Sequence, residues 1–324
     1  MGRLIFSISL VVFGIFTGYL FQILVKKKQW DLPYEAIRRA LQKTALLFLN
    51  PVAIVGATWV AHIDDIKIAA MPFMGMTALF TGGILAFGFS KLLKLNRPQT
   101  GSFIVCGGFT NIGSLGALFC FLFLGEAGFA LVPFYKLFEE SIYYAIGFPI
   151  AKSYGDVDAE NLTFWGRVKS AVTDLFVVVA VCSIITGLCL NLLDIPRPVV
   201  YASVNTVIIP LAALLLLISI GMAMRFSAIG RYLKPGLLIA AFKAFFIPAI
   251  VFLLGWKLGL GEIDNGLPLK VVLILSSMPV GFIAMVPPTI YRLDIDLSNA
   301  CWLITNAMVI LQVPILLWLV QSFL

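Results

Sequence analysis

Long apolar stretches follow one another along almost the whole chain, and short polar connections separate them. Ten of these stretches reach about 20 residues, the length that an α-helix needs to cross the hydrocarbon core of a bilayer. They lie near residues 4–25, 42–61, 67–92, 100–124, 127–150, 170–192, 199–224, 235–258, 269–291 and 297–322. The pattern predicts an all-α integral membrane protein with about ten transmembrane helices.

Composition agrees with a membrane environment and excludes an ordinary soluble domain. Hydrophobic residues make up 61% of the 324 residues and charged residues 12%, whereas soluble domains carry about 25% charged residues. The basic residues form no stripe on a soluble domain, so a nucleic-acid partner is not indicated. The five cysteines lack metal-site spacing with the single histidine, His62, and we expect neither a metal site nor a cofactor.

Basic residues alternate between the two sides of the predicted helix array. Sixteen Lys and Arg residues fall in the odd-numbered loops, whereas five fall at the chain start and in the even-numbered loops. The positive-inside rule therefore places the odd loops in the cytoplasm. We expect a multi-pass protein of the cell membrane with both termini on the extracytoplasmic side.

The longest polar stretch divides the ten helices into two groups of five. It predicts a first five-helix repeat at 1–151, a cytoplasmic linker at 152–169 and a second five-helix repeat at 170–324. Because five is odd, the second repeat enters the membrane from the opposite side. Inverted repeats of this kind are typical of secondary transporters.

The fourth helix of each group contains residues that interrupt a helix. Four glycines surround Asn111 between Gly107 and Gly116, and Ser276 and Ser277 precede Pro279. Such breaks in helices 4 and 9 expose half-helix N-termini, whose unpaired N–H groups favour an anion. The alternative is that the glycines permit close helix packing and that the proline makes a simple kink.

The candidate substrate-binding residues follow from these interruptions and from the Asn-Pro pair of the second helix. Ser277 is a candidate N-cap for a half-helix that Pro279 would begin. The full candidate set is Asn50, Thr110, Asn111, Gly113, Ser276, Ser277 and Pro279.

Four charged residues lie within predicted membrane helices, where a charge is expected to be paired or functional. Lys136 and Glu140 are four residues apart and can pair on one helix face. Glu139 points elsewhere, and Lys243 is its candidate partner unless Lys243 attracts the substrate. We therefore predict that this charge network takes part in proton or substrate coupling.

In several places the chain resembles the auxin efflux carrier family, which includes malonate-type permeases. The matching stretches are Asn111–Gly116, Ile209–Met222, Phe242–Pro248 and Ser277–Pro279. The resemblance implies ten helices in two inverted repeats, crossing broken helices at the site, and small organic anions such as malonate or indole-acetate as substrates. The chain departs from the family at Ala117, where proline is frequent.

Other functions stay open beside transport of an organic anion. The stretch Gly107–Asn111 is similar to the bile-acid–sodium symporter family, although the ninth helix lacks the acidic residue that sodium would require before Asp294. A membrane channel and a membrane-embedded enzyme are the alternatives of a different class, and the sequence contains no Ser–His pairing within the membrane for an enzyme. Proton coupling, sodium coupling, uniport without a coupled ion and a homodimer are all compatible with the sequence.

Overall fold

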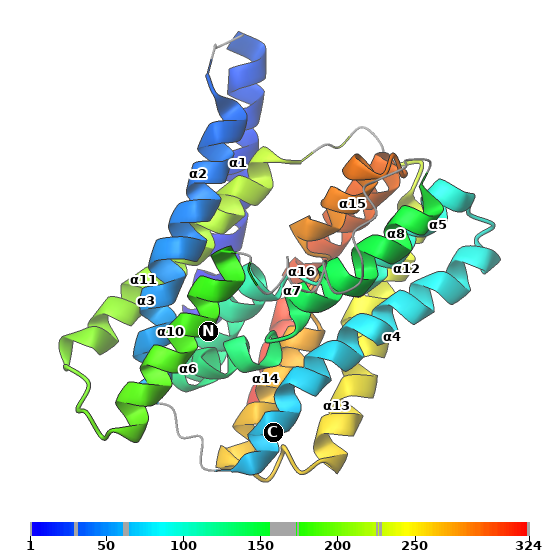
Figure 1. The fold of residues 1–324 in the computed structure, drawn as a ribbon. Coiled ribbons are helices and arrows are strands. Elements are labelled where there is room, and N and C mark those ends of the chain that lie inside the picture. Colours follow the sequence, from blue (N-terminus) through cyan, green and yellow to red (C-terminus); the bar gives the residue numbers. More distant parts are fainter. Residues whose placement is uncertain are drawn as a thin grey trace. The chain divides into compact units, whose positions relative to one another are not determined.

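The computed structural model describes residues 2–28, 32–60, 65–155, 173, 175–224, 226 and 229–322. Helices account for most of these residues (Figure 1). The α-helices are α1 Gly2–Lys28, α2 Tyr34–Thr44, α3 Asn50–Thr58, α4 Met71–Leu92, α5 Arg97–Gly108, α6 Ala117–Tyr135, α7 Glu139–Ile142, α8 Phe148–Tyr154, α10 Leu175–Leu192, α11 Val200–Met222, α12 Leu233–Ala241, α13 Ile247–Lys257, α14 Leu267–Ser276, α15 Val286–Ile290 and α16 Ile295–Ser322.

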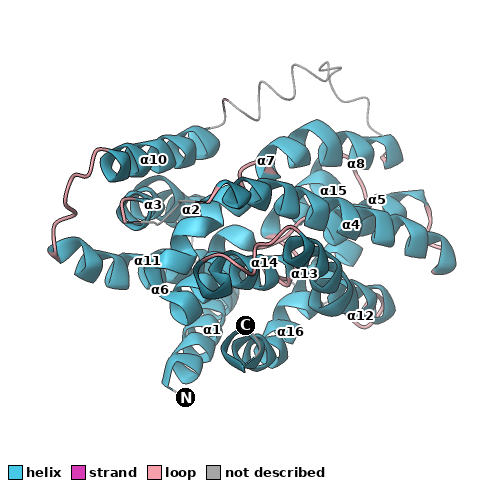
Figure 2. Ribbon diagram, turned by 90° about the horizontal axis from the view of Figure 1, so that it is seen from below, coloured by secondary structure: helices cyan, strands magenta, loops and turns pink. Residues whose placement is uncertain are grey.

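Shorter helical turns join several of these helices into continuous runs. Four are π-helical turns, in which the backbone hydrogen bonds span five residues: η1 Ala45–Leu49, η3 Ile112–Gly116, η4 Tyr143–Gly147 and η5 Phe242–Phe246. Three are 3₁₀ turns: η2 Ile66–Ala70, η6 Asp264–Gly266 and η7 Phe282–Met285. Figure 2 shows helices and connecting loops throughout the described part of the chain, which confirms the predicted all-α class.

Six helical runs are long and apolar enough to cross a membrane, judged by length and composition. They are Tyr34–Thr58, Ile66–Leu92, Ile112–Tyr154, Val200–Met222, Leu233–Lys257 and Ile295–Gln321. Two shorter apolar helices occupy Ser9–Val25 and Val178–Leu192. The protein is therefore a multi-pass membrane protein, and the count of ten spans stays a prediction.

The longest of these runs changes direction at a glycine. Ile112–Tyr154 contains 43 residues, more than one crossing of a bilayer needs. Within it Gly125 has φ 73° and ψ −162°, a conformation that is readily accessible only to glycine. The bend lies where the sequence places the boundary between the fourth and fifth predicted helices.

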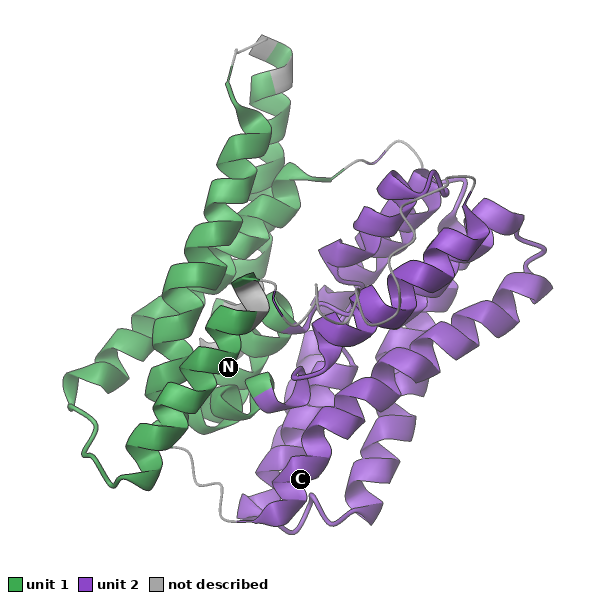
Figure 3. Ribbon diagram, viewed as in Figure 1, with its two compact units in different colours: residues 1–64, 113–133, 175–224 green, residues 65–112, 134–174, 225–324 purple. Residues whose placement is uncertain are grey.

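The chain forms two compact units, and each draws segments from both halves of the sequence (Figure 3). Unit 1 comprises residues 1–64, 113–133 and 175–224, and unit 2 comprises residues 65–112, 134–174 and 225–324. The predicted repeats divide the chain by position along the sequence, whereas the two units divide it by contacts in space. The units therefore do not test the repeats, which stay a prediction. His62 and residues 156–169 of the predicted linker lie outside the described residues.

In unit 1, α1 and α11 approach each other closely at glycines. A Cβ added to Gly18 would lie 2.0 Å from the carbonyl oxygen of Ile218, and one added to Gly221 would lie 2.1 Å from that of Ile15. Small residues at such contacts are typical of helix packing in membranes. The hydroxyl of Tyr34 on α2 donates to the carbonyl of Met222, at the end of α11.

In unit 2, glycines bring α4 and α5 together in the same way. A Cβ on Gly107 would lie 2.3 Å from the carbonyl oxygen of Gly82, and one on Gly82 would lie 2.1 Å from that of Gly107. In the same unit, α12 packs on α16, α13 packs on both α14 and α4, and α8 packs on α5. These contacts place the C-terminal end of α5 inside the unit.

Prolines explain three of the four π-helical turns. Pro51, Pro149 and Pro248 each stand two residues after the end of a π turn. In each case the intervening residue donates its N–H five residues back, from Asn50 to Ala45, from Phe148 to Tyr143 and from Ile247 to Phe242. A proline ring clashes with the carbonyl of the preceding turn and removes one donor, and the wider π turn relieves that clash.

Candidate substrate site at the crossing of two extended segments

Two short extended segments cross inside unit 2, where both interrupted helices break. One follows the end of α5 and the other follows the end of α14. Thr110 and Val280 form an antiparallel bridge. The N–H of Asn111 donates to the carbonyl of Pro279 at 2.8 Å, and the N–H of Gly281 donates to that of Phe109 at 3.2 Å. Each extended segment therefore provides hydrogen-bond partners for backbone groups of the other.

Side chains of α16 hold the second extended segment from its other side. The N–H of Val280 donates to the hydroxyl oxygen of Thr305 at 3.2 Å, and the carbonyl of Val280 accepts from the amide of Asn306 at 3.3 Å. Gln312 donates to the carbonyl of Ser277 at 2.8 Å. These bonds supply partners for backbone that no helix satisfies, which membrane interiors require.

The approach of the two segments depends on a glycine. A Cβ added to Gly281 would lie 2.7 Å from the carbonyl oxygen of Thr110 and 2.9 Å from its carbonyl carbon. Real Cβ contacts of this length are excluded by sterics. Gly107, which precedes the first break, has a different role. It allows α5 to pack closely on α4, which is the alternative role that the sequence suggested for these glycines.

The structure corrects the predicted roles of Ser277 and Pro279. The Ser277 hydroxyl donates 2.7 Å back to the carbonyl of Leu273 and caps no following helix. Pro279 lies in the extended segment, and the next helical turn begins at Phe282. The reason is that a proline disfavours helical backbone in the residue before it, so Met278 leaves the helix. The Ser276 hydroxyl likewise donates to Leu273, at 3.2 Å.

Lys243 reaches the crossing from the π turn η5. Its ammonium group donates to the hydroxyl oxygen of Thr110 at 2.5 Å, and the lysine is 2% exposed. No carboxylate among the described residues lies within 4.0 Å of this ammonium group. Glu139 makes its close contacts with Lys136 and Tyr143 instead, although its charge also acts on Lys243, so the Lys243–Glu139 pairing stays a prediction.

A second chain of polar contacts reaches the same threonine from the turn η4. The N–H of Thr110 donates to the hydroxyl oxygen of Tyr143 at 2.9 Å. That hydroxyl donates to Glu139 at 2.5 Å. Lys136 lies 3.5 Å from Glu139 and 2.9 Å from Glu140, so the predicted Lys136–Glu140 pair is present. Thr110 thus connects a buried lysine to a buried glutamate.

Sequence reasoning missed Tyr143, although a signal for it was present. Tyr143 follows Glu139 by four residues, the spacing at which side chains meet on a helix. The ring of Phe109 also packs against it, with ring centroids 4.0 Å apart and ring planes tilted by 33°. A Cβ on Gly147 would lie 2.5 Å from the Phe109 ring, so this glycine makes room for the aromatic pair beside the crossing.

The candidate residues do not all lie in unit 2. The crossing gathers Thr110, Asn111, Ser276, Ser277 and Pro279 from the predicted substrate-binding set. Asn50, at the start of α3, and Gly113 belong to unit 1. Their contact with substrate stays a prediction.

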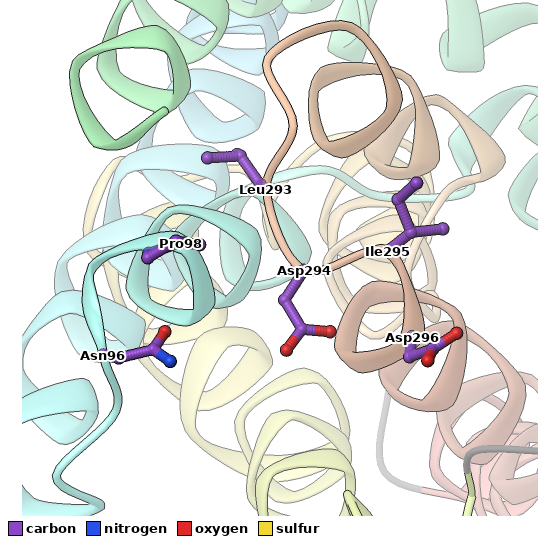
Figure 4. Close-up of a pocket in the computed structure, with 6 residues that line it drawn as sticks. All are labelled: Asn96, Pro98, Leu293, Asp294, Ile295 and Asp296. Atoms are coloured by element: carbon purple, nitrogen blue, oxygen red, sulfur yellow. The ribbon is translucent and has the colours of Figure 1, made fainter. Parts of the chain in front are cut away.

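Unit 2 also has a surface pocket that the sequence did not indicate (Figure 4). Its volume is about 450 Å³, and its lining residues are Asn96, Pro98, Leu293, Asp294, Ile295 and Asp296. The carboxylate of Asp294 accepts from the Tyr232 hydroxyl at 2.6 Å and from the N–H of Leu297 at 2.8 Å. The pocket therefore lies where α16 begins, beside the start of α5.

Comparison with known proteins gives one informative likeness. No protein-family model matches the chain. The chain is 26% identical over 270 residues, covering 80% of each sequence, to a protein of Methanocaldococcus jannaschii named "Uncharacterized transporter MJ1031". This likeness and the apolar helices together support a membrane transporter.

Proposed function

We propose that this protein is a secondary transporter of a small organic anion, a carboxylate, and that the anion binds at the crossing in unit 2. The observation that carries the proposal is the buried ammonium group of Lys243, which contacts a neutral hydroxyl at the crossing. A charge removed from water is stable when it is paired and hydrogen-bonded. A substrate carboxylate would supply the missing negative charge.

The chemistry around Lys243 suits such a ligand. An ammonium group has three donors, and the Thr110 hydroxyl uses one of them. Helical turns begin at Ile112 and at Phe282, within two residues of the bridged pair, and their first N–H groups also favour negative charge. We propose that Thr110, Asn111, Ser276, Ser277 and Pro279 shape this site in unit 2.

The positions of prolines support the proposed inverted repeats. Pro51 and Pro210 lie in the second segment of each half, and Pro149 and Pro314 lie in the fifth. The fourth segments of both halves hold the two interruptions. Matching irregularities in corresponding segments are the sequence sign of an inverted-repeat transporter, which works by alternating access. The resemblance to auxin efflux carriers and the name of the archaeal relative agree with this proposal.

The direct test is transport by the purified protein in sealed liposomes. We expect saturable uptake of radiolabelled malonate or another small carboxylate, with competition by unlabelled carboxylates. Imposed pH or sodium gradients then show whether either ion is coupled, and a sodium requirement would favour the bile-acid-type alternative. Flux that never saturates would indicate a channel, and covalent conversion of the solute would indicate an enzyme. Either of these outcomes would overturn the proposal.

A further inference from the structure

A row of polar groups begins at Asp294, just before α16, and continues along one face of α16 at a constant spacing of four residues. Asp294, Ser298, Trp302 and Asn306 follow one another at this spacing, and side chains four apart share a helix face. Ser298 and Trp302 are fully buried, and Asn306 is 3% exposed. The row begins at the surface pocket and ends at Asn306, which donates to Val280 at the crossing.

The facing helix, α5, presents a row with the same spacing. Pro98 lines the pocket and is followed on α5 by Ser102 and Cys106, and Thr110 lies in the extended segment just beyond the end of α5. The Ser102 hydroxyl donates to the backbone carbonyl of Asp294 at 2.8 Å. The Cys106 thiol lies 3.8 Å from the backbone carbonyl oxygen of Ser298. The two rows therefore lie side by side at Asp294 and Ser298, and we call the zone between α5 and α16 the α5–α16 seam.

Three side-chain atoms along this seam have no hydrogen-bond partner among the described protein atoms. They are the hydroxyl of Ser298, the indole N–H of Trp302 and the side-chain carbonyl oxygen of Asn306. Buried polar atoms are nearly always hydrogen-bonded, and one such atom left alone costs about 1–3 kcal/mol. Because three such atoms lie on one helix face, we expect one kind of partner to bind all three.

Water matches both the chemistry and the spacing of these atoms. The row offers a hydroxyl, a donor and an acceptor in turn, and a water molecule can accept from one and donate to the next. Residues four apart are separated by about 6 Å along a helix axis, a gap that one or two bridging waters with hydrogen bonds of about 2.9 Å can fill. A cation would be repelled by the indole N–H, and an anion would be repelled by the carbonyl of Asn306.

We propose that the α5–α16 seam holds a file of water molecules that joins the Asp294 pocket to the crossing at Thr110. The file supplies the missing hydrogen bonds of Ser298, Trp302 and Asn306, as buried waters do in other proteins. It also gives the buried Lys243–Thr110 pair a hydrated connection to the surface of unit 2. The inference is independent of which solute the protein carries.

The indole N–H of Trp302 provides the test, because it lies in the middle of the file. The full-length protein is labelled with ¹⁵N-tryptophan, and the Trp302 signal is assigned by its loss in Trp302→Phe. We expect a cross-peak between this indole proton and water, and exchange with D₂O within minutes. An indole proton that lacks the water cross-peak and persists for hours in D₂O would overturn the proposal.

Two shape-matched substitutions at Ser298 make the test specific. Ser298→Val fills the position without a polar group, whereas Ser298→Thr has nearly the same shape and keeps the hydroxyl. We expect Ser298→Val to slow exchange of the Trp302 indole by about tenfold or more, and Ser298→Thr to stay within about twofold of the unsubstituted protein. Equal rates in the two variants would contradict a water file through Ser298. If neither variant folds, the unsubstituted protein alone still decides the outcome.

Discussion

The ammonium group of Lys243 is hydrogen-bonded to the hydroxyl of Thr110, so a buried cation contacts the crossing of the two extended segments. The backbone N–H of the same threonine donates to the Tyr143 hydroxyl, which in turn donates to the carboxylate of Glu139. Thr110 is therefore both a backbone partner of Val280 and the point at which two ionisable side chains converge.

The first prediction concerns the charge of Lys243. Lys243→Met should abolish stabilisation of the purified protein by dicarboxylates and remove carboxylate uptake, because the cation that pairs with the substrate is lost. Its melting temperature without ligand should change little, since replacing a buried charge by an apolar side chain is often neutral or stabilising. Thermal unfolding with and without malonate measures both effects.

An exposed lysine of the same unit serves as the control for Lys243. Lys91 lies at the end of α4, with its ammonium group 4.6 Å from the centre of the Phe87 ring. Lys91→Met should keep both the ligand-induced stabilisation and uptake. Full uptake by Lys243→Met would exclude Lys243 as the partner of the substrate anion.

The second prediction tests the close approach at Gly281. Gly281→Ala should destabilise the protein by about 1–3 kcal/mol, because its new methyl group would press on the carbonyl of Thr110. Gly83, within α4, has open space around it, so Gly83→Ala should stabilise by up to about 1 kcal/mol. Chemical unfolding of the two variants in one detergent gives the comparison, and equal stabilities would contradict the steric argument.

The third prediction concerns the coupling of Tyr143 with Glu139. Tyr143→Phe removes one hydrogen-bond partner from the N–H of Thr110 and one from the buried carboxylate of Glu139. The protein should therefore lose about 1–3 kcal/mol of stability. Glu139→Gln tests the other end of the same bond. In the double variant the two losses should fall short of additivity by about 0.5–3 kcal/mol, as for residues in one network. Strict additivity in unfolding measurements would show that the two side chains act separately.

The fourth prediction contrasts two ion pairs of different burial. Arg197 lies 2.6 Å from Glu126 in unit 1 and also donates to the carbonyl of Gly56 at 2.8 Å. Their side chains are 13% and 20% exposed. Arg197→Met should therefore destabilise by about 3 kcal/mol, because it leaves a largely buried carboxylate without its partner.

An exposed pair supplies the control for Arg197. Lys67 and Glu262 are 2.7 Å apart, with side chains 41% and 75% exposed. Loss of a surface pair changes stability by about 1 kcal/mol or less, so Lys67→Met should have a small effect. A loss in Arg197→Met no larger than that in Lys67→Met would refute the role of burial.

Much of the fold was predictable from local chemistry. Apolar stretches of about 20 residues indicate helices whatever their neighbours are, and Pro279 indicates a break through its missing N–H. The Lys136–Glu140 pair follows from helical spacing alone. Each of these features depends on residues close together in the sequence.

The remainder depends on contacts between distant segments. Lys243 meets Thr110 across 133 positions, and no local pattern specifies that pairing. The assignment of Glu139 to Tyr143 rather than to Lys243 depends on the packing that brings both to Thr110. The seam likewise appears only when α5 and α16 face each other, because Ser298 alone is an ordinary small residue of a membrane helix.

The π turn η5 changes the direction in which the side chains after it point. A π turn acts as one extra residue within an α-helix, so it advances the direction of every later side chain by about 100°. Residues before Phe242 and after Phe246 thus follow two different helical phases, although they form one continuous run. Removal of a single residue from this turn would bring back the clash at Pro248 and point all of α13 in a new direction relative to α12, so this segment should tolerate substitutions far better than deletions.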